Sequence, residues 1–316
     1  MSRPIRMITL AETYLADKRC LGFDLRISGQ QLLNFARFAD DAGHEGPLTV
    51  EIAESWARSR SKQVPITWAR RIEIVRPFAK YLQQFDVSTE IPRSNVFGRA
   101  HRRLVPHIYT APEIQGLLAA AAELPAIDHL RPVRYVTLFG LLAATGLRLS
   151  EALKIRRADV NFERGQLTIR ETKFRKSRLV PLHPSVTQAL QNYAMCRDQW
   201  QPVALSDHFF LSSHNCELKP STVEYVFNFL HSNLQWVSRS DYPMPRIHDL
   251  RHSFICNRVL LWYRQGVNVD NAMPMLSTYV GHAKVTDTYW YLTGIPELMT
   301  IAAQRFEHFA EGVDHG

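Results

Sequence analysis

The chain offers little that would indicate a secreted, membrane-embedded or metal-stabilised protein. Only four of its 316 residues are cysteines, and they lie far apart without a CxxC pair: Cys20, Cys196, Cys216 and Cys256. This spacing argues against a zinc ribbon and against a disulfide framework. The most apolar stretch, residues 135–147, is too short to cross a bilayer, and the first residues lack the pattern of a signal peptide. We therefore expect a soluble, cytoplasmic protein of a reducing compartment, with no membrane partner.

Positive charge is in excess and unevenly distributed. The formal net charge is +8, and the pI is near 9.4. Residues 1–106 hold 17 lysines and arginines against 11 acidic residues, whereas the remainder holds 21 against 19. A basic balance favours a polyanionic partner, and the asymmetry suggests that the first third grips phosphates. The length is sufficient for two domains, each with its own core.

Residues 1–92 are predicted to form a helical bundle. Thr9 and Glu12 have the spacing of a capping box, which predicts a helix start, and the pattern predicts further helices over 28–42, 50–59 and 65–85. The basic side chains that we expect to contact DNA from this region are Arg58, Arg60, Lys62, Arg70, Arg71 and Arg76. Charge alone leaves a merely solvated surface equally open.

Residues 93–107 are predicted to form a basic linker. They contain proline and several arginines, and they show little apolar periodicity. Within this segment, Arg102 and Arg103 are further candidate DNA contacts.

The second domain is predicted to span residues 108–316. Thr110 and Glu113 form another capping-box pattern at its start, and the helical run that follows is interrupted at Gly146. Strands predicted over 166–170 and 178–182 form a small antiparallel hairpin. The last helix begins near Pro296 and carries an apolar stripe formed by Leu298, Ile301, Ala302, Phe306 and Phe309. The whole chain is thus expected to be mainly helical, with one small sheet.

Arg148, in the segment ATGLRLSEAL, is a candidate phosphate ligand. Transfer of a phosphodiester places extra negative charge on the non-bridging oxygens, so the site needs fixed positive donors. Arginine fits because its planar fork makes two hydrogen bonds and stays charged. Glu151, three residues later, can hold this guanidinium in place. An isolated pair of this kind is more often a surface ion pair.

His248 and Arg251, in HDLRH, lie three residues apart and therefore on one face of a helix. Together they can supply an imidazole for proton transfer and a second phosphate clamp. His248 and His252 also have the spacing of a metal site. A neighbouring cation and the absence of a glutamate between them argue against metal, and we predict that the protein binds none.

Lys173, in ETKFRKSRLVPL, can donate the proton that a departing 5′ oxygen needs. Arg175 and Lys176 are close enough to contact DNA phosphate as well. The sequence leaves open whether Lys173 or Lys176 is the proton donor.

The nucleophile is expected to be a tyrosine near the end of the chain. A free tyrosine has a pKa of about 10, so attack at neutral pH needs a base or cationic surroundings. Tyr279, Tyr289 and Tyr291 are the candidates. On one helix, Tyr289 and Tyr291 point about 200° apart, so only one of them can face the phosphate.

Read in order, these segments resemble the tyrosine recombinase, or phage-type integrase, family. The words ATGLRLSEAL, TKFRKSRLVPL, HDLRHSF and YVGH followed after eight residues by tyrosine match the family's signature over residues 108–295. Any one word is common, but the set in this order is highly specific. One departure is that the family's hairpin is often glycine-rich, whereas Thr172 and Phe174 flank Lys173. The TYWYL ending further resembles the integrases of transposons and other mobile elements.

The resemblance implies a role for each matching residue and a reaction. The implied catalytic set, with Glu151 in support, is Arg148, Lys173, His248, Arg251, His282 and Tyr291. Family spacing selects Tyr291, nine residues after His282, as the nucleophile. The implied reaction is cleavage of double-stranded DNA at specific sites through a 3′-phosphotyrosyl intermediate and exchange of strands through a Holliday junction. It needs no metal, ATP or other cofactor, and it proceeds in a homo-tetramer on DNA.

Three other functions are possible for the same residues. A type IB topoisomerase uses a similar constellation to relax supercoils, and a DNA-binding accessory protein could carry an inactive site. A metallohydrolase built on His248 and His252 is the third. We rank all three below the recombinase because every catalytic position holds a competent residue.

Overall fold

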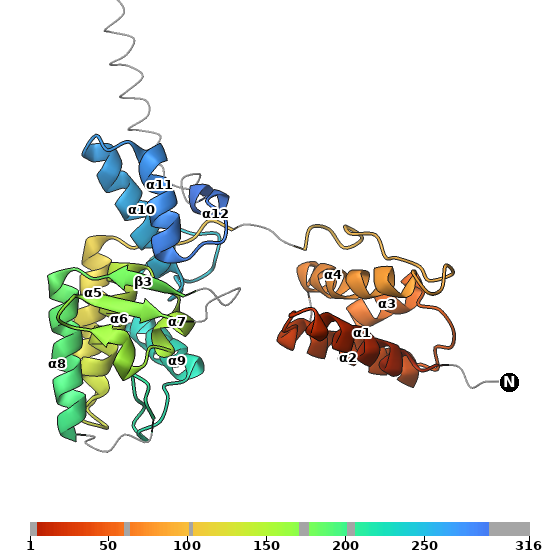
Figure 1. Cartoon of the computed structure of the whole chain (residues 1–316), viewed down its shortest axis with the longest axis horizontal. Coiled ribbons are helices and arrows are strands. Elements are labelled where there is room, and N and C mark those ends of the chain that lie inside the picture. Colours follow the sequence, from red (N-terminus) through yellow and green to blue (C-terminus); the bar gives the residue numbers. More distant parts are fainter. Residues whose placement is uncertain (1–4, 60–63, 101–103, 171–176, 201–205, 291–316) are drawn as a thin grey trace, which may run out of the picture. The chain divides into compact units, whose positions relative to one another are not determined.

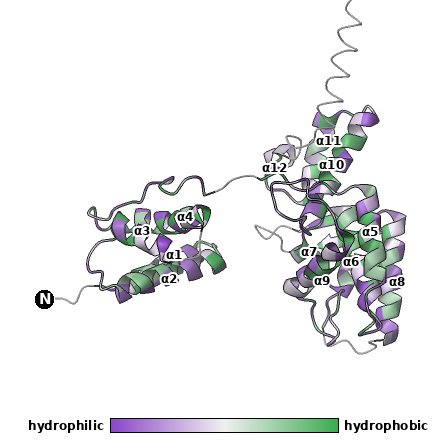
Figure 2. Ribbon diagram, turned by 180° about the vertical axis from the view of Figure 1, so that it is seen from behind, coloured by the Kyte–Doolittle hydropathy of each residue, from purple (hydrophilic) through white to green (hydrophobic). Residues whose placement is uncertain are grey.

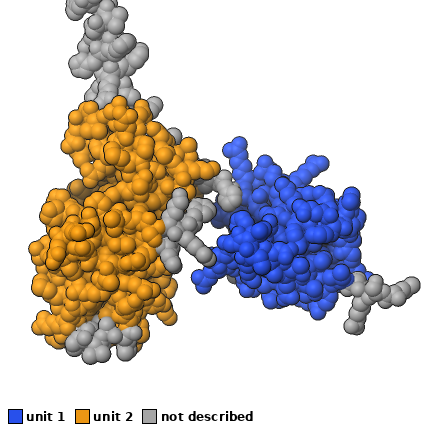
Figure 3. All heavy atoms as spheres, viewed as in Figure 1, with its two compact units in different colours: residues 1–103 blue, residues 104–316 orange. Residues whose placement is uncertain are grey.

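The computed structural model describes residues 5–59, 64–100, 104–170, 177–200 and 206–290. The contacts within the chain divide it into unit 1, Met1–Arg103, and unit 2, Leu104–Gly316 (Figures 1 and 3). Each unit has its own buried core.

The described part of unit 1 is helical. Its elements are α1 (Met7–Cys20), α2 (Arg26–Asp41), α3 (Val50–Arg58) and α4 (Pro65–Leu82). They enclose a core that includes the fully buried side chains of Phe35, Trp56 and Phe78. Each of these helices carries both hydrophobic and hydrophilic residues (Figure 2), as expected for helices that bury one face.

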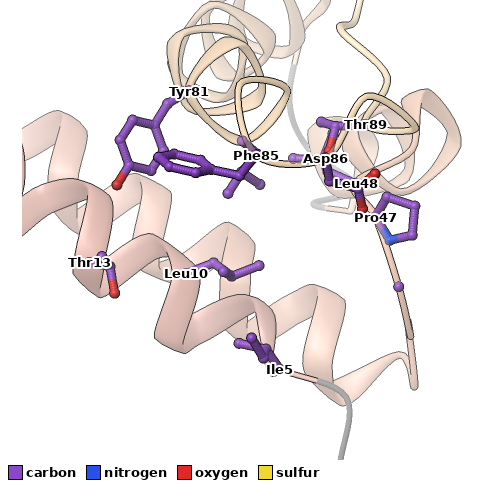
Figure 4. Close-up of a pocket in the computed structure, with 11 residues that line it drawn as sticks. Ile5, Leu10, Thr13, Pro47, Leu48, Tyr81, Phe85, Asp86 and Thr89 are labelled. Atoms are coloured by element: carbon purple, nitrogen blue, oxygen red, sulfur yellow. The ribbon is translucent and has the colours of Figure 1, made fainter.

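A largely apolar pocket of about 480 Å³ lies in unit 1. Leu10 on α1, Leu48 in the segment before α3, and Tyr81 and Phe85 around the end of α4 line it (Figure 4). Its lining includes no histidine, lysine or arginine. This pocket therefore does not supply the groups that phosphate chemistry requires.

The two ends of the segment predicted as a linker each contact a folded unit. Its first part packs on unit 1, where Ala100 is buried and Phe97 stands edge-on to Trp68 with the ring centroids 5.7 Å apart. Its last part pairs with unit 2, because Val105 N–H donates to the Asp241 carboxylate at 3.0 Å.

Unit 2 is mainly helical. Its helices, as far as the structure describes them, are α5 (Ala111–Ala122), α6 (Arg131–Thr145), α7 (Leu149–Leu153), α8 (Pro184–Trp200), α9 (Pro220–Leu234), α10 (Asp249–Arg264), α11 (Val269–Val280) and α12 (Thr286–Tyr289). The predicted capping box at the start of α5 is present: Glu113 N–H donates to the Thr110 hydroxyl, and Thr110 N–H donates to the Glu113 carboxylate. Leu138, Phe139 and Phe227 are among the side chains buried in the core.

A short 3-10 turn, η1 (Arg157–Asp159), leads into the small antiparallel sheet of unit 2. The described strands are β1 (Val160–Asn161), β2 (Gln166–Ile169) and β3 (Arg178–Pro181), in that order across the sheet. Ile169 pairs with Arg178 at the end of the predicted hairpin from which its turn departs. The expected fold class, mainly α-helical with a small antiparallel sheet, is confirmed. The sequence did not predict β1, because two residues are too few to show an alternating pattern.

Gly146 ends α6 and turns the chain into α7. Its backbone is left-handed, with φ of +63°, and a Cβ there would lie 2.5 Å from the Phe254 ring. Glycine is favoured in this conformation because it has no Cβ. The predicted break at this residue is therefore confirmed.

The predicted start of α1 at Thr9 was wrong. The helix begins at Met7, and no side chain within the helix caps it. Instead, the Asp40 carboxylate near the end of α2 accepts hydrogen bonds from the Met7 and Ile8 amides, at 2.8 and 3.2 Å. These are two of the amides that a helix start leaves without an internal partner. The capping carboxylate thus lies 33 residues after Met7 in the sequence.

Replacing Asp40 by alanine is expected to destabilise α1 by about 1–2 kcal/mol, the usual cost of losing a helix cap. Hydrogen exchange of the α1 amides should become faster by about 5- to 30-fold, because about 1.4 kcal/mol corresponds to a factor of ten. Asp41→Ala is the matched control, because Asp41 is the exposed neighbour. Equal exchange in the two variants would contradict the assignment.

Candidate active site

The C-terminal end of α11 gathers arginines from three other elements. Within the described residues, the hydrogen bonds join Arg178 Nε to Tyr279 O at 2.8 Å, Arg251 Nη2 to Val280 O at 2.8 Å, and Arg148 Nη1 and Nη2 to Gly281 O at 3.4 Å. The last carbonyls of a helix have no partner within it and carry its negative dipole end, so cations are favoured there. Residues predicted from separate segments, Arg148 and Arg251, are thereby brought together.

Gly281 makes the close approach of these arginines possible. It follows the last residue of α11 in the left-handed conformation, with φ of +71°. A Cβ at this position would lie 2.5 Å from Arg178 Nη1. Only a residue without a side chain leaves room for the guanidinium and adopts this backbone without strain.

Glu151 is shared between two of the arginines. Its Oε1 accepts from Arg148 Nη1 at 2.8 Å and from Arg178 Nη1 at 3.2 Å, while Oε2 accepts from Arg178 Nη2 at 3.0 Å. Burial raises the pKa of Glu151, but the bonds and charge of Arg178, followed by those of Arg148, outweigh burial and hold the pKa below its usual range. The carboxylate therefore stays charged and orients both guanidiniums.

Arg251 connects two helix ends. It lies in the first turn of α10 and is 2% exposed. Its Nη1 donates to Gly146 O at 2.7 Å. Since Nη2 binds the end of α11, the guanidinium joins the end of α6 to the end of α11. A planar, always charged fork is suited to such a two-sided contact.

His248 occupies the position just before α10. It is an exposed residue, but its ring stands edge-on to that of His252, with the centroids 4.9 Å apart. Partial removal from water, followed by the positive charge of Arg251, lowers the pKa of His248 to about 4. The imidazole is therefore neutral at pH 7 in the absence of an anion.

His282 follows Gly281 and contacts α12. Its Nδ1 lies 2.7 Å from the hydroxyl of Thr288, which is fully buried. Burial, followed by the charges of Arg251 and Arg148, lowers the pKa of His282 to about 4. The ring is thus a neutral hydrogen-bonding group at the edge of the arginine cluster.

Two predicted catalytic residues, Lys173 and Tyr291, lie outside the described residues. The same holds for six of the predicted DNA contacts: Arg60, Lys62, Arg102, Arg103, Arg175 and Lys176. The apolar stripe expected after Pro296 also falls there.

Of the described candidates for DNA contact, Arg71 has a different environment from the one expected. It is 8% exposed, its guanidinium lies over the Trp56 ring at 3.9 Å, and its Nη1 donates to Ala57 O at 3.2 Å. These contacts fix the end of α3 against α4, so the structure gives Arg71 a role in packing. The exposed Arg58 and Arg70 lie at the surface of the same unit.

The sequence analysis did not single out Arg178 or Thr288 as site residues. Both lie within motifs that it quoted, but no local pattern distinguishes them. Arg178 looks like an ordinary strand residue, and its bonds reach α7 and α11, which lie 27 and 101 residues away. Thr288 reads as a helix-start residue next to the tyrosines.

The described part of the chain lacks both a cluster of metal-binding side chains and a membrane-spanning helix. It contains no group of three or more histidine, cysteine, aspartate or glutamate side chains that could hold a metal ion. No helix in it is long and apolar enough to cross a membrane.

Comparison with known proteins defines the class. Residues 108–294 match the model of the phage integrase family. The chain belongs to this family, and it is a DNA strand-breaking and rejoining recombinase of the tyrosine recombinase class. The expected resemblance is thereby confirmed.

Particular relatives agree with this class. The chain is 41% identical over 302 residues to "Putative integrase/recombinase y4rB" of Sinorhizobium fredii (strain NBRC 101917 / NGR234), which covers 94% of this chain and 95% of that protein. It is 26% identical over 242 residues to "Tyrosine recombinase" of Pseudothermotoga lettingae (strain ATCC BAA-301 / DSM 14385 / NBRC 107922 / TMO), covering 77% and 75%. Its fold is similar to that of the Tn1549 transposon integrase in complex with transposon right end DNA, with a TM-score of 0.68, 16% identity and coverage of 97% and 100%.

The buried His252 predicts a loss of stability in acid. Burial, followed by the influence of His248, lowers the pKa of His252 from 6.5 to about 3. Between these values the unfolded chain binds a proton that the folded chain does not, so stability falls as the pH declines through this window. At pH 5 the loss is about 2 kcal/mol relative to neutral pH.

The variant His252→Asn is expected to remove most of this loss, measured by urea unfolding at pH 7 and pH 5. The exposed His214 gives the matched control, His214→Asn. An unchanged dependence on pH in His252→Asn would show that this imidazole does not limit acid stability.

Proposed function

We propose that this chain is a site-specific recombinase of double-stranded DNA, with Tyr291 as its nucleophile. The phenol oxygen forms a bond to the scissile phosphorus, and the bond from phosphorus to the 5′ oxygen breaks. The products are a 3′-phosphotyrosyl link and a free 5′-hydroxyl. A 5′-hydroxyl of a partner duplex reverses the step, and strands exchange through a Holliday junction without metal or ATP. The observation that carries the proposal is the arginine cluster at the end of α11.

The charge of this cluster suits a phosphodiester. Arg148, Arg178 and Arg251 together with Glu151 carry a net charge of +2, since His248 and His282 are neutral. A phosphodiester has one negative charge, and attack by a phenolate adds a second. Fixed positive groups stabilise charge that develops in the transition state more than charge already present in the substrate. We assign Arg148 and Arg251 to the non-bridging oxygens.

The described tyrosines favour Tyr291 by elimination. Tyr289 donates to the Asp270 carboxylate at 3.2 Å, and Asp270 lies in the first turn of α11. At 1.5 Å per residue, this turn is about 15 Å from the carbonyls that bind the arginines. The Tyr279 hydroxyl donates to Pro181 O at 3.3 Å. Burial raises the pKa of both tyrosines, and for Tyr289 the bond to Asp270 adds to the effect.

Lys173 is assigned as the donor of a proton to the departing 5′ oxygen. The support is the pairing of Ile169 with Arg178, because Arg178 contacts Glu151 directly. The hairpin turn therefore leaves from the arginine cluster. Lys173 lies four residues beyond Ile169, a separation that spans at most about 14 Å of extended chain.

The histidines are assigned to proton transfer and phosphate binding. His248, whose ring is neutral at pH 7, accepts the proton of the Tyr291 phenol. We assign the Thr288 hydroxyl, 2.7 Å from Nδ1 of His282, as the donor in this bond, which places the ring proton on Nε2, where it is available to a phosphate oxygen.

We further propose that the residues up to about 92 form a DNA-gripping domain and that four chains assemble on two DNA sites. Of the side chains predicted to contact DNA, Arg58 and Arg70 are described and exposed. The support for a DNA partner is that the similar structures include XerH site-specific recombinase bound to difH substrate. The likeness to a transposon integrase supports a mobile element as the source.

Changing Tyr291 to phenylalanine is expected to abolish the covalent adduct with DNA and to leave DNA affinity unchanged, because only the nucleophilic oxygen is removed. Adducts are trapped on nicked DNA taken from the ends of the proposed mobile element, and denaturing gels detect them. Sequencing the trapped end also identifies the DNA site. Tyr289→Phe is the matched control and should form the adduct normally. Loss of the adduct in Tyr289→Phe alone would assign the nucleophile to Tyr289.

Changing Thr288 to valine is expected to slow adduct formation about fivefold, since a hydrogen bond contributes about 1 kcal/mol net. Valine keeps the shape of threonine, so DNA affinity should not change. Thr288→Ser should restore the rate, and Thr286→Val, at an exposed position of α12, should have no effect. A wild-type rate in Thr288→Val would exclude a role for this hydroxyl in orienting His282.

A further inference from the structure

We infer that Arg178 is a positioning residue for this reaction: it fixes the Glu151 carboxylate and, through it, the phosphate-binding guanidinium of Arg148. The inference rests on the proposed function, because it concerns how the phosphate site is held in shape. It adds a residue of β3 to a site otherwise built from the loops and helices around α11.

All three side-chain nitrogens of Arg178 are directed inward. Nη1 and Nη2 donate to the two oxygens of Glu151 at 3.2 and 3.0 Å, and Nε donates to Tyr279 O at 2.8 Å. The paired bonds form the two-pronged contact that makes arginine specific for a carboxylate. Arg178 therefore ties α7 to the end of α11.

Exposure separates the roles of the two arginines. The Arg148 side chain is 32% exposed, whereas that of Arg178 is 10% exposed and that of Glu151 is 6% exposed. An incoming phosphate can thus reach Arg148, while Arg178 lies behind the carboxylate. Since Nε, Nη1 and Nη2 of Arg178 all bind Tyr279 O or Glu151, we infer that Arg178 acts through Glu151.

Glu151 needs both arginines to hold one geometry. Its Oε1 is shared by Arg148 and Arg178, but Oε2 binds the Arg178 side chain and the Arg148 amide, at 3.0 and 3.1 Å. Without Arg178, the carboxylate loses two of its bonds and can rotate. Arg148 would then lose its fixed orientation, and displacements of about 1 Å in such sites slow reactions by as much as 100-fold.

The first experiment measures single-turnover adduct formation on a nicked duplex that carries the sequence recovered from the wild-type adduct. Arg178→Met is expected to form the adduct about 100-fold more slowly, with the Kd for the same duplex changed less than threefold. Arg178→Lys should be intermediate, because an ammonium restores the charge but not the two-pronged contact. If the wild-type chain forms no adduct, the proposed function fails. If the wild-type chain reacts and Arg178→Met reacts equally fast, only this inference fails.

A double-mutant cycle tests whether Arg178 acts through Glu151. In the Glu151→Gln background, Arg178→Met should cost less than threefold in rate, since the carboxylate that it orients is gone. This pair also removes both buried charges together, so that folding does not leave one of them unpaired. Multiplicative effects of the two substitutions would overturn the inference.

The pH dependence gives a readout that a purely structural role would not change. The charged groups facing Glu151 are Arg148, just before α7, and Arg178 from β3. Arg251 and the titratable His282 lie around the same end of α11. Burial raises the pKa of Glu151, and Arg178 lowers it. Removing Arg178 should therefore raise the pKa of Glu151. As the pH is lowered, Arg178→Met should therefore lose activity at a higher pH than the wild type does. Glu151→Gln should remove this difference. An acid limb identical to that of wild type would contradict the inference.

Arg134→Met is the matched control. Arg134 is also a buried arginine, and it donates to both oxygens of Asp128 at 3.2 and 3.1 Å. It lies 12 residues before Gly146, about 18 Å along α6 from the cluster. Its loss should lower the melting temperature without changing the rate or its pH dependence. A second test, Gly281→Ala, keeps all charges but displaces Arg178, and it should also slow the reaction.

Discussion

The hydrogen bonds between arginines and the C-terminal carbonyls of α11 organise the chemistry of unit 2. A helix end that faces protein needs donors, and here they come from the residue before α7, from β3 and from α10. The guanidiniums are thereby oriented by the fold itself before any phosphate binds. Such preorganisation means that little reorganisation is required when charge develops on a substrate. The same bonds explain why residues 148, 178 and 251, which are far apart in sequence, form one site.

Concentrating cations in this way opposes folding, and the structure shows what offsets it. Glu151 supplies one full negative charge, and the end of α11 adds the negative end of a helix dipole. The nearby histidines respond to the same field, because the positive charges add to burial in lowering the pKa of His248 and His282 to about 4. A bound phosphate would reverse this influence. The imidazoles are therefore groups whose proton affinity depends on whether the anion is present, which is the behaviour that proton transfer during cleavage requires.

Local patterns in the sequence predicted local structure well. The capping box of Thr110, the helix break at Gly146 and the hairpin strands all depend on residues close in sequence. The features that were missed depend on distant partners. The start of α1 is set by Asp40 from α2, and Arg71 is buried by Trp56 from another helix. For the site, the family motifs brought the right segments together, whereas the part played by β3 could be recognised only from contacts.

The elements that precede the proposed nucleophile depend on the same helix. Two hydrogen bonds join α12 to α11. Thr288 bonds to His282, just past the end of α11, and Tyr289 bonds to Asp270 in the first turn of α11. The arginines proposed to bind phosphate and the segment that leads to Tyr291 thus both contact α11. A displacement of α11 would move both the clamps and the attachment of α12. Since cleavage needs the attacking oxygen and the phosphorus at reacting distance, the placement of α11 affects both sides of the proposed reaction.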